Sequence, residues 1–226
     1  MPCLKRIAAS LALLLAVTTL SALEVSLGLE GAVNYSIVST STRWENTSLD
    51  NFVGMDVMIP LEFRFTDWLA VDTGIRYIMK DAYYKKSYNG SNIDEFAILN
   101  HFLEFPLTAQ FSAGSNRVRV FLGLGGYLGV RLAETHIGSS MTLINGTESY
   151  AENVKLNSDD NRFDAGLIAE GGFRFPFRRG DFYIKTRYQY SLTSLAKDSQ
   201  TDTVHTYLDS LSFAVAYLFK LGGPRW

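Results

Sequence analysis

The sequence predicts an all-β protein, an eight-stranded antiparallel up-and-down transmembrane β-barrel. Two observations carry this prediction. Apolar residues alternate with polar or small residues over long runs, and the connections between the runs are alternately short and long. A period of two is typical of strands, whereas helical spacing is not sustained anywhere after residue 22.

The first 22 residues are predicted to be a signal peptide, which leaves one domain over residues 23–226. Lys5 and Arg6 form a positively charged start, residues 7–20 are apolar, and Ser21 and Ala22 are small. The only cysteine, Cys3, precedes the apolar segment, so the signal is not that of a lipoprotein. A mature chain without cysteine has neither disulfides nor thiolate chemistry.

Composition excludes several classes of protein. Apolar residues make up 47% of the chain and charged residues 19%, which excludes a disordered protein. The formal net charge is −2 and no basic block occurs, so we expect no nucleic-acid partner. No later run reaches about 18 consecutive apolar residues, so no helical membrane span is expected.

Eight runs alternate with the period of a strand. In the second run, Val57, Leu61 and Phe63 share one face, and Asp56 and Glu62 share the other. The runs cover about residues 23–38, 53–66, 69–80, 97–111, 118–132, 162–177, 182–192 and 207–221.

The connections between these runs are of two kinds. Residues 66–68, 112–117 and 178–181 are predicted tight turns, and residues 39–52, 81–96, 133–161 and 193–206 are predicted long polar loops. The turns therefore share one end of the barrel with both termini, and the loops share the other end.

Three features predict that the apolar face meets lipid. Soluble strands average about five or six residues, and these runs are longer. Aromatic residues gather on the apolar face toward both ends of the strands, as in interfacial belts. Long loops at one end and short turns at the other are typical of outer-membrane barrels, and strands in lipid must close to pair every amide. The aromatic residues are Phe63, Phe65, Phe105, Phe111, Phe175, Phe177, Phe182, Tyr217 and Phe219 toward the turns, and Tyr35, Tyr77, Phe163, Tyr188 and Tyr190 toward the loops.

The polar face then lines the barrel interior. Eight strands enclose a space that side chains fill or nearly fill, and an unpaired charge there is costly, so acids and bases should pair across strands. Glycines such as Gly123 and Gly129 would leave room for long arginines. We expect the paired network to comprise Glu62, Arg64, Asp72, Arg76, Glu104, Arg119, Arg131, Arg162, Asp164, Glu170, Arg174, Lys185 and Arg187; Glu24, Glu30, Asp56, Lys80 and Lys220 share this face.

Several segments resemble a known family. Residues 103–107 (LEFPL) and 120–129 (VFLGLGGYLG) are similar to the central hairpin of PorT-like outer-membrane β-barrel domains, and residues 163–167 (FDAGL) with 171–173 (GGF) resemble the strand that follows. The architecture is also similar to that of the OmpX, OmpA-domain and OmpW barrels. This resemblance implies an integral protein of the bacterial outer membrane, surrounded by its lipid and with periplasmic termini, and it brings no known active site.

The last run resembles the signal that the barrel-insertion machinery reads during assembly. The matching positions are Ser212, Ala214, Tyr217 and Phe219, with alanine where that signal has glycine. The resemblance implies that this machinery is a partner during assembly.

The sequence gives no sign of catalysis. His101, His136 and His205 lack a serine and a carboxylate at local spacing, so we expect no enzyme, no metal site and no cofactor.

Two functions remain open for a membrane barrel, and a soluble barrel is a third possibility. The first is a barrel with a largely filled interior whose surface loops, at residues 39–52, 81–96, 133–161 and 193–206, meet an extracellular partner or support the envelope. The second is an OmpW-like, porin-like narrow channel for small or apolar solutes. A lipocalin-like soluble carrier would also alternate, with its apolar face around a ligand.

Overall fold

The computed structural model describes residues 23–40, 47–88, 92–142, 146–154, 156, 161–195 and 206–222. The predicted signal peptide lies outside these residues. The described residues form nine strands, and they include no helix long and apolar enough to cross a membrane. The strands are β1 (Glu24–Thr40), β2 (Thr47–Arg64), β3 (Leu69–Tyr88), β4 (Asn92–Gly114), β5 (Arg119–Thr142), β6 (Gly146–Val154), β7 (Phe163–Pro176), β8 (Gly180–Ser191) and β9 (Thr206–Gly222).

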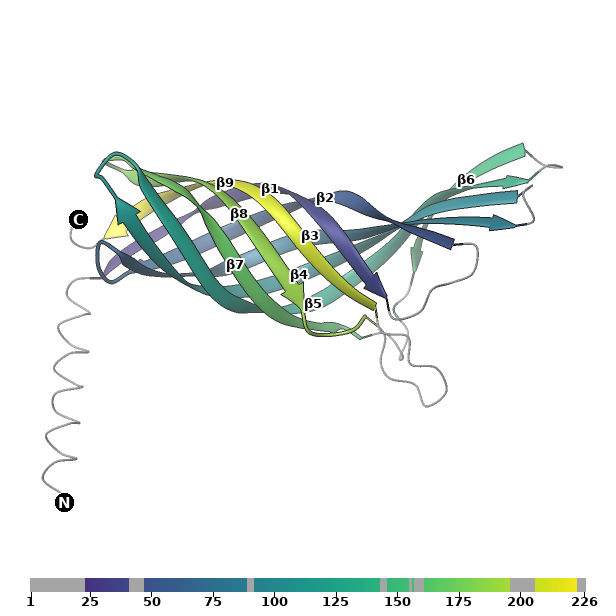
Figure 1. Ribbon diagram of the computed structural model, residues 1–226, viewed down its shortest axis with the longest axis horizontal. Coiled ribbons are helices and arrows are strands. Elements are labelled where there is room, and N and C mark those ends of the chain that lie inside the picture. Colours follow the sequence, from purple (N-terminus) through teal and green to yellow (C-terminus); the bar gives the residue numbers. More distant parts are fainter. Residues whose placement is uncertain are drawn as a thin grey trace, which may run out of the picture.

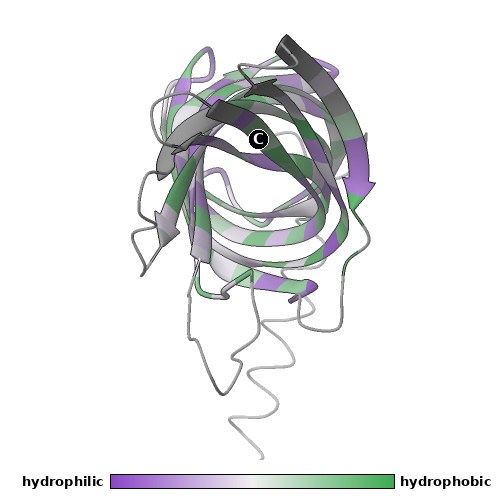
Figure 2. Cartoon of the chain, turned by 90° about the vertical axis from the view of Figure 1, so that its right-hand side faces the viewer, coloured by the Kyte–Doolittle hydropathy of each residue, from purple (hydrophilic) through white to green (hydrophobic). Residues whose placement is uncertain are grey.

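Eight of these strands close into a ring, which confirms the predicted fold class (Figures 1 and 2). The order around the ring is β4-β3-β2-β1-β9-β8-β7-β5, and β5 pairs with β4 to close it. Every pair is antiparallel, including β1 with β9, so the first and last strands meet along their length. The short connections β2–β3, β4–β5 and β7–β8 share the end of the barrel where β1 begins and β9 ends (Figure 1).

Side chains alternate between the interior and the outer wall as predicted. On β7, Asp164 and Glu170 are buried, whereas Phe163, Leu167 and Phe173 are about half exposed. On β5, Leu122 and Leu124 are 67% and 65% exposed, although leucine prefers burial in a soluble protein. An outer wall of exposed leucine, valine and phenylalanine is the surface that a hydrocarbon solvent requires.

Four strands of the ring continue past it and, together with β6, form a projecting sheet. Beyond Val130, β5 no longer pairs with β7 and pairs instead with β6. The projecting sheet comprises residues 47–51 of β2, 82–88 of β3, 92–99 of β4, 133–142 of β5 and all of β6 (Figure 1). The predicted loops 81–96 and 133–161 are therefore largely strand, and residues 47–52 of the first predicted loop belong to β2. Most of the predicted loop 193–206 lies outside the described residues.

Two irregularities mark the place where the projecting sheet leaves the ring. The first is a shift in the register between β2 and β3, between Asn51 and Asp56. The second is that polar side chains of β1 form hydrogen bonds with the backbone of β3 at this level. The Asn34 amide donates to the Met79 carbonyl at 2.7 Å, and the Asp81 amide donates to the Ser36 hydroxyl at 3.0 Å. These contacts satisfy backbone groups that would otherwise lack a partner inside a membrane.

A pair of substitutions on one strand tests which part of the outer wall meets lipid. We expect Leu124→Arg, near the middle of the ring portion of β5, to lower the free energy of unfolding in lipid vesicles by about 2–4 kcal/mol. Ile137→Arg, in the projecting part of the same strand, should change it by less than about 0.5 kcal/mol, because Ile137 is 46% exposed outside the ring. Denaturant titration of tryptophan fluorescence measures both, and equal costs at the two positions would contradict the assignment.

Candidate functional site: the charged interior

The barrel interior holds the charged residues of the alternating pattern in successive layers. Nearest the short turns, Arg64, Glu62 and Tyr183 form a closed triangle. Arg64 Nη2 donates to Glu62 Oε1 at 2.5 Å and to the Tyr183 hydroxyl at 3.0 Å, and that hydroxyl donates to Glu62 Oε2 at 2.6 Å. All three residues are buried, so these hydrogen bonds take the place of hydrogen bonds to water.

A second set of pairs lies at the same end. Arg174 donates through Nε and Nη2 to Asp181 Oδ2, both at 2.7 Å. Lys220 lies 3.3 Å from Asp181 and 3.7 Å from Glu24. Phe121 packs edge-on against Tyr183 at a ring-centroid distance of 5.6 Å and, with Ala216 and Leu218, forms an apolar cluster there.

The central layer holds three acids, Glu30, Glu170 and Asp72, and two bases, Arg187 and Lys185. Arg187 contacts Glu30 at 2.8 Å and Glu170 at 3.0 Å, and Lys185 contacts Glu30 at 2.6 Å. Gln110 donates to Glu170 at 2.8 Å and to Asp72 at 3.2 Å, and the Lys185 ammonium lies 3.5 Å from Asp72. Glu30, on β1, and Arg187, on β8, are 157 residues apart in sequence, so closure of the ring brings them together.

The next layer is centred on Arg76, whose exposed fraction is 0%. Its guanidinium donates to Asp56 at 2.5 Å, to Gln189 at 2.7 Å and to the Ser212 hydroxyl at 2.8 Å. Gln189 in turn donates to Glu104 at 2.8 Å. Arginine suits this position because its guanidinium carries several N–H donors. Through them this one side chain of β3 contacts residues of β2, β8 and β9.

The layer nearest the projecting sheet is centred on Lys80. Its ammonium lies 2.8 Å from both Glu104 and Asp164, and it also lies over the rings of Tyr127 and Phe102, at 4.6 Å and 5.1 Å from their centroids. Above it, Phe102 packs with Ile78 and Leu208, and this buried apolar cluster is covered in part by Val38 and Leu195. The central layers around Arg187 and Arg76 therefore lie between the two apolar clusters, and further charged pairs lie at each end.

The structure places twelve of the thirteen predicted network residues in the interior and one outside it. Arg162 precedes β7, is exposed, and donates to the Leu156 carbonyl at 3.4 Å, because the inward alternation of β7 begins only at Asp164. Arg119 is buried at the opposite end and pairs with exposed Asp67 at 2.9 Å. Arg131 pairs with Glu134 and Asn100 where the projecting sheet begins.

Two glycines of β5 have a different role from the predicted one. A Cβ at Gly123 would lie 2.8 Å from Cγ of Glu170, and a Cβ at Gly129 would lie 3.1 Å from Cγ of Glu104. These glycines therefore leave room for acids on neighbouring strands, rather than for arginines.

Some members of the interior network were missed. Asp181 was assigned to a tight turn, but it begins the buried face of β8 and is 1% exposed. Gln110, Gln189, Tyr127 and Tyr183 complete the hydrogen bonds of the charged residues; their inward position follows from the alternation, although their partners do not. Phe102 and Phe121 are apolar residues on the polar face, and that mismatch is the signal that would have found the two apolar clusters.

The structure also describes the four residues of the predicted assembly signal and two of the histidines considered for catalysis. On β9, Ser212 and Ala214 point inward, Phe219 is exposed on the outer wall and Tyr217 is half-buried. His101 lies on the outer face of β4, where its Nδ1 is 2.6 Å from the Tyr77 hydroxyl, and His136 lies in the projecting sheet, 2.5 Å from Glu134. Among the described residues, no group of three or more histidine, cysteine or acidic side chains is placed to hold a metal ion.

Removing one buried charge tests whether the interior is dry. We expect Arg76→Met to lower the free energy of unfolding by about 3–5 kcal/mol, because it leaves Asp56 buried without its cationic partner. Arg162→Met is the matched control and should cost less than about 0.5 kcal/mol, since Arg162 is exposed. Chemical denaturation of both variants in detergent micelles measures the difference; an Arg76→Met barrel as stable as the unsubstituted chain would show that water solvates Asp56.

Three solved structures are similar to this chain at low sequence identity. The chain shares 15% identity with Neisserial surface protein A, over 86% of this chain and 97% of that one, with a TM-score of 0.46. It shares 15% identity with Ail, the attachment invasion locus protein of Yersinia pestis, over 87% and 99%, with a TM-score of 0.40. With the outer membrane protein OprG from Pseudomonas aeruginosa it shares 12%, over 88% and 93%, with a TM-score of 0.42.

A comparison with curated proteins found no significant match. A family profile described as an outer membrane protein beta-barrel domain matches residues 18–197, which is more than half of the chain. With its closed ring of strands, apolar outer wall and paired interior, the chain belongs to the family of outer membrane protein β-barrel domains.

Proposed function

We propose that this outer-membrane barrel conducts no solute and uses its projecting sheet to bind a partner outside the cell. In this proposal the projecting sheet faces the exterior, and the short turns and both termini face the periplasm. The observation that carries the proposal is the projecting sheet itself: the predicted loops are replaced by paired strands that end in an open edge.

Side-chain contacts hold the projecting sheet in a fixed shape. Tyr84 stacks on Phe96 with ring centroids 5.1 Å apart and an interplanar angle of 7°, and the Phe96 ring lies 6.1 Å from that of His136. Gly138 faces Phe96, and a Cβ there would come within 2.6 Å of the Phe96 Cβ. A rigid surface loses less conformational entropy on binding than a mobile loop does.

The opposite face of the projecting sheet carries charge. Lys85 contacts Glu95 at 2.6 Å on the neighbouring strand. The hydrogen bond from Lys85 lowers the pKa of the Glu95 carboxyl below its ordinary value. Opposite charges across two strands stabilise their pairing modestly at a solvent-exposed position.

One edge of the projecting sheet is β6, which among the described residues pairs with β5 alone. Residues 47–51 of β2 form the other edge. An exposed edge strand offers a row of unpaired backbone groups to an extended segment of another protein. Ala151, Glu152 and Asn153 are exposed on it. Because β6 carries Glu148 and Glu152 and no basic residue, a complementary partner segment would be extended and basic.

A shortened hairpin tests this proposal. Residues 137–151 are replaced by Asn-Gly, which joins the register partners His136 and Glu152 by a two-residue turn. Random peptides of about ten residues, matched to the length of β6, are displayed on phage and panned against the folded protein in detergent micelles. We expect the unshortened chain to enrich basic, β-branched peptides and the shortened variant to bind them at least about tenfold more weakly.

The matched control replaces residues 197–204, which connect β8 to β9 in the sequence, by glycine and serine. Both variants must still migrate faster on a gel before boiling than after it, because the ring is intact in both. Peptides that bind the shortened variant as well as the unshortened chain would contradict the proposal, as would a failure of the unshortened chain to enrich any peptide.

A further inference from the structure

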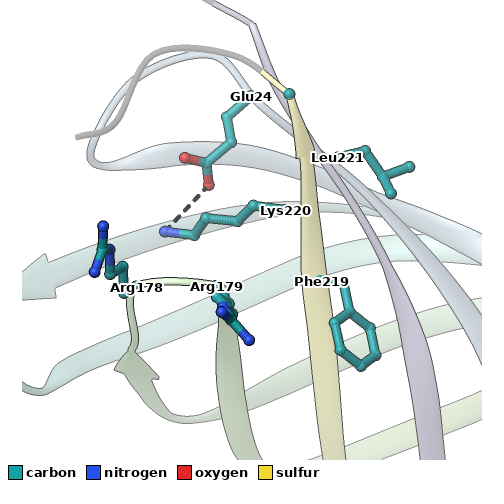
Figure 3. Close-up of a pocket in the computed structure, with 7 residues that line it drawn as sticks. Glu24, Arg178, Arg179, Phe219, Lys220 and Leu221 are labelled. Atoms are coloured by element: carbon teal, nitrogen blue, oxygen red, sulfur yellow. Dashed lines mark ion pairs between the residues drawn. The ribbon is translucent and has the colours of Figure 1, made fainter.

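A basic hollow lies at the rim of the barrel, at the end opposite the projecting sheet. The hollow has a volume of about 470 Å³, and its lining includes Glu24, Arg178, Arg179, Phe219 and Lys220 (Figure 3). A second hollow of about 490 Å³ is lined by Phe177, Arg178, Arg179 and Tyr217. Arg178 and Arg179 thus line both hollows, between the rim and the outer wall.

The backbone around these two arginines is fixed. They lie in the turn between β7 and β8, where the Phe177 amide donates to the Gly180 carbonyl at 2.8 Å and the Lys220 amide donates to the Arg179 carbonyl at 3.2 Å. A Cβ at Gly180 would lie 2.9 Å from the ring of Tyr217 and 2.3 Å from the Leu218 carbonyl oxygen. Glycine at this position therefore lets Tyr217 pack against the turn.

The positive charge of the turn is not neutralised by its neighbours. Asp181 already contacts Arg174 and Lys220, and Glu24 contacts Lys220 and lies 3.8 Å from Arg64. Arg178 and Arg179 are exposed, and no ion pair joins either of them to an acid in the part of the chain that the structure describes. Two consecutive arginines without an acidic partner among the described residues therefore lie in this turn at the rim.

Aromatic side chains surround this point on the outer wall. Phe177 and Phe219 are 56% and 55% exposed, and Tyr217 packs edge-on against Phe219 at 4.7 Å. Aromatic residues at the end of a lipid-facing strand lie at the level of the lipid headgroups. The outer wall next to them is apolar and contacts acyl chains, so a ligand here can span both environments.

We propose that Arg178 and Arg179 bind the phosphate of a glycerophospholipid, whose acyl chains lie against Phe177, Tyr217 and Phe219. Guanidinium groups match phosphate oxygens through pairs of parallel hydrogen bonds. The lipid is a bound ligand with a defined place on the barrel, in addition to the lipids that surround the wall. The site is independent of partner binding by the projecting sheet, which lies at the other end.

Native mass spectrometry of the folded mature chain tests this site. The probes are phosphatidylglycerol and a diacylglycerol with the same acyl chains, which lacks the phosphate. We expect the chain to retain phosphatidylglycerol in preference to diacylglycerol, and the double variant Arg178→Gln/Arg179→Gln to retain it about 30-fold less, since each basic side chain at an anionic surface contributes about fivefold.

The matched control is Arg117→Gln/Arg162→Gln, which removes the same charge from two exposed arginines outside the hollow. It should retain phosphatidylglycerol as the unsubstituted chain does. Equal losses in the two double variants would overturn the proposal, because net charge would then account for retention. Equal retention of diacylglycerol and phosphatidylglycerol by the unsubstituted chain would also overturn it, because the acyl chains alone would then bind.

Discussion

Most charges that the ring encloses meet a charge or hydrogen-bond partner on another strand, and this pairing governs the rest of the structure. Removing an ion from water costs several kcal/mol, and close, fully hydrogen-bonded partners offset that cost. The partners come from strands far apart in sequence, as with Glu30 and Arg187 or Lys80 and Asp164, so the pairing requires a closed ring. Closure in turn lets the outer wall be apolar, because every strand of the ring has a partner strand on both sides and offers no open edge to lipid.

The ring and its two faces could be predicted from the sequence, because the alternation of Val57 and Leu61 with Asp56 and Glu62 reports directly which way each side chain points. The pairs could not be predicted, because partner choice depends on strand register. Arg131 shows the limit: a register shift beside it brings it next to Glu134, three residues away on the same strand. The projecting sheet was missed because its part of the sequence contains residue types that favour turns, such as Asn89-Gly90-Ser91, and because apolar and polar residues no longer alternate there.

Buried polar groups and polar groups accessible to other molecules lie at different positions along the barrel axis. Most charged side chains of the interior pair with one another, and apolar clusters around Phe102 and Phe121 flank the central charged layers. Groups available to other molecules therefore lie at the two ends, on the edge of β6 and at the turn that carries Arg178 and Arg179. This division separates a structural centre, in which one substitution disturbs several contacts, from two ends that can change without loss of the fold.

The central claim is that the paired layers and apolar clusters leave no continuous path through the barrel. The most direct test is single-channel recording of the refolded mature chain in a planar lipid bilayer, with folding confirmed in the same preparation by faster gel migration before boiling. The account predicts a silent bilayer. Stable, reproducible openings from the folded protein would contradict it and would identify the interior charges as the lining of a channel.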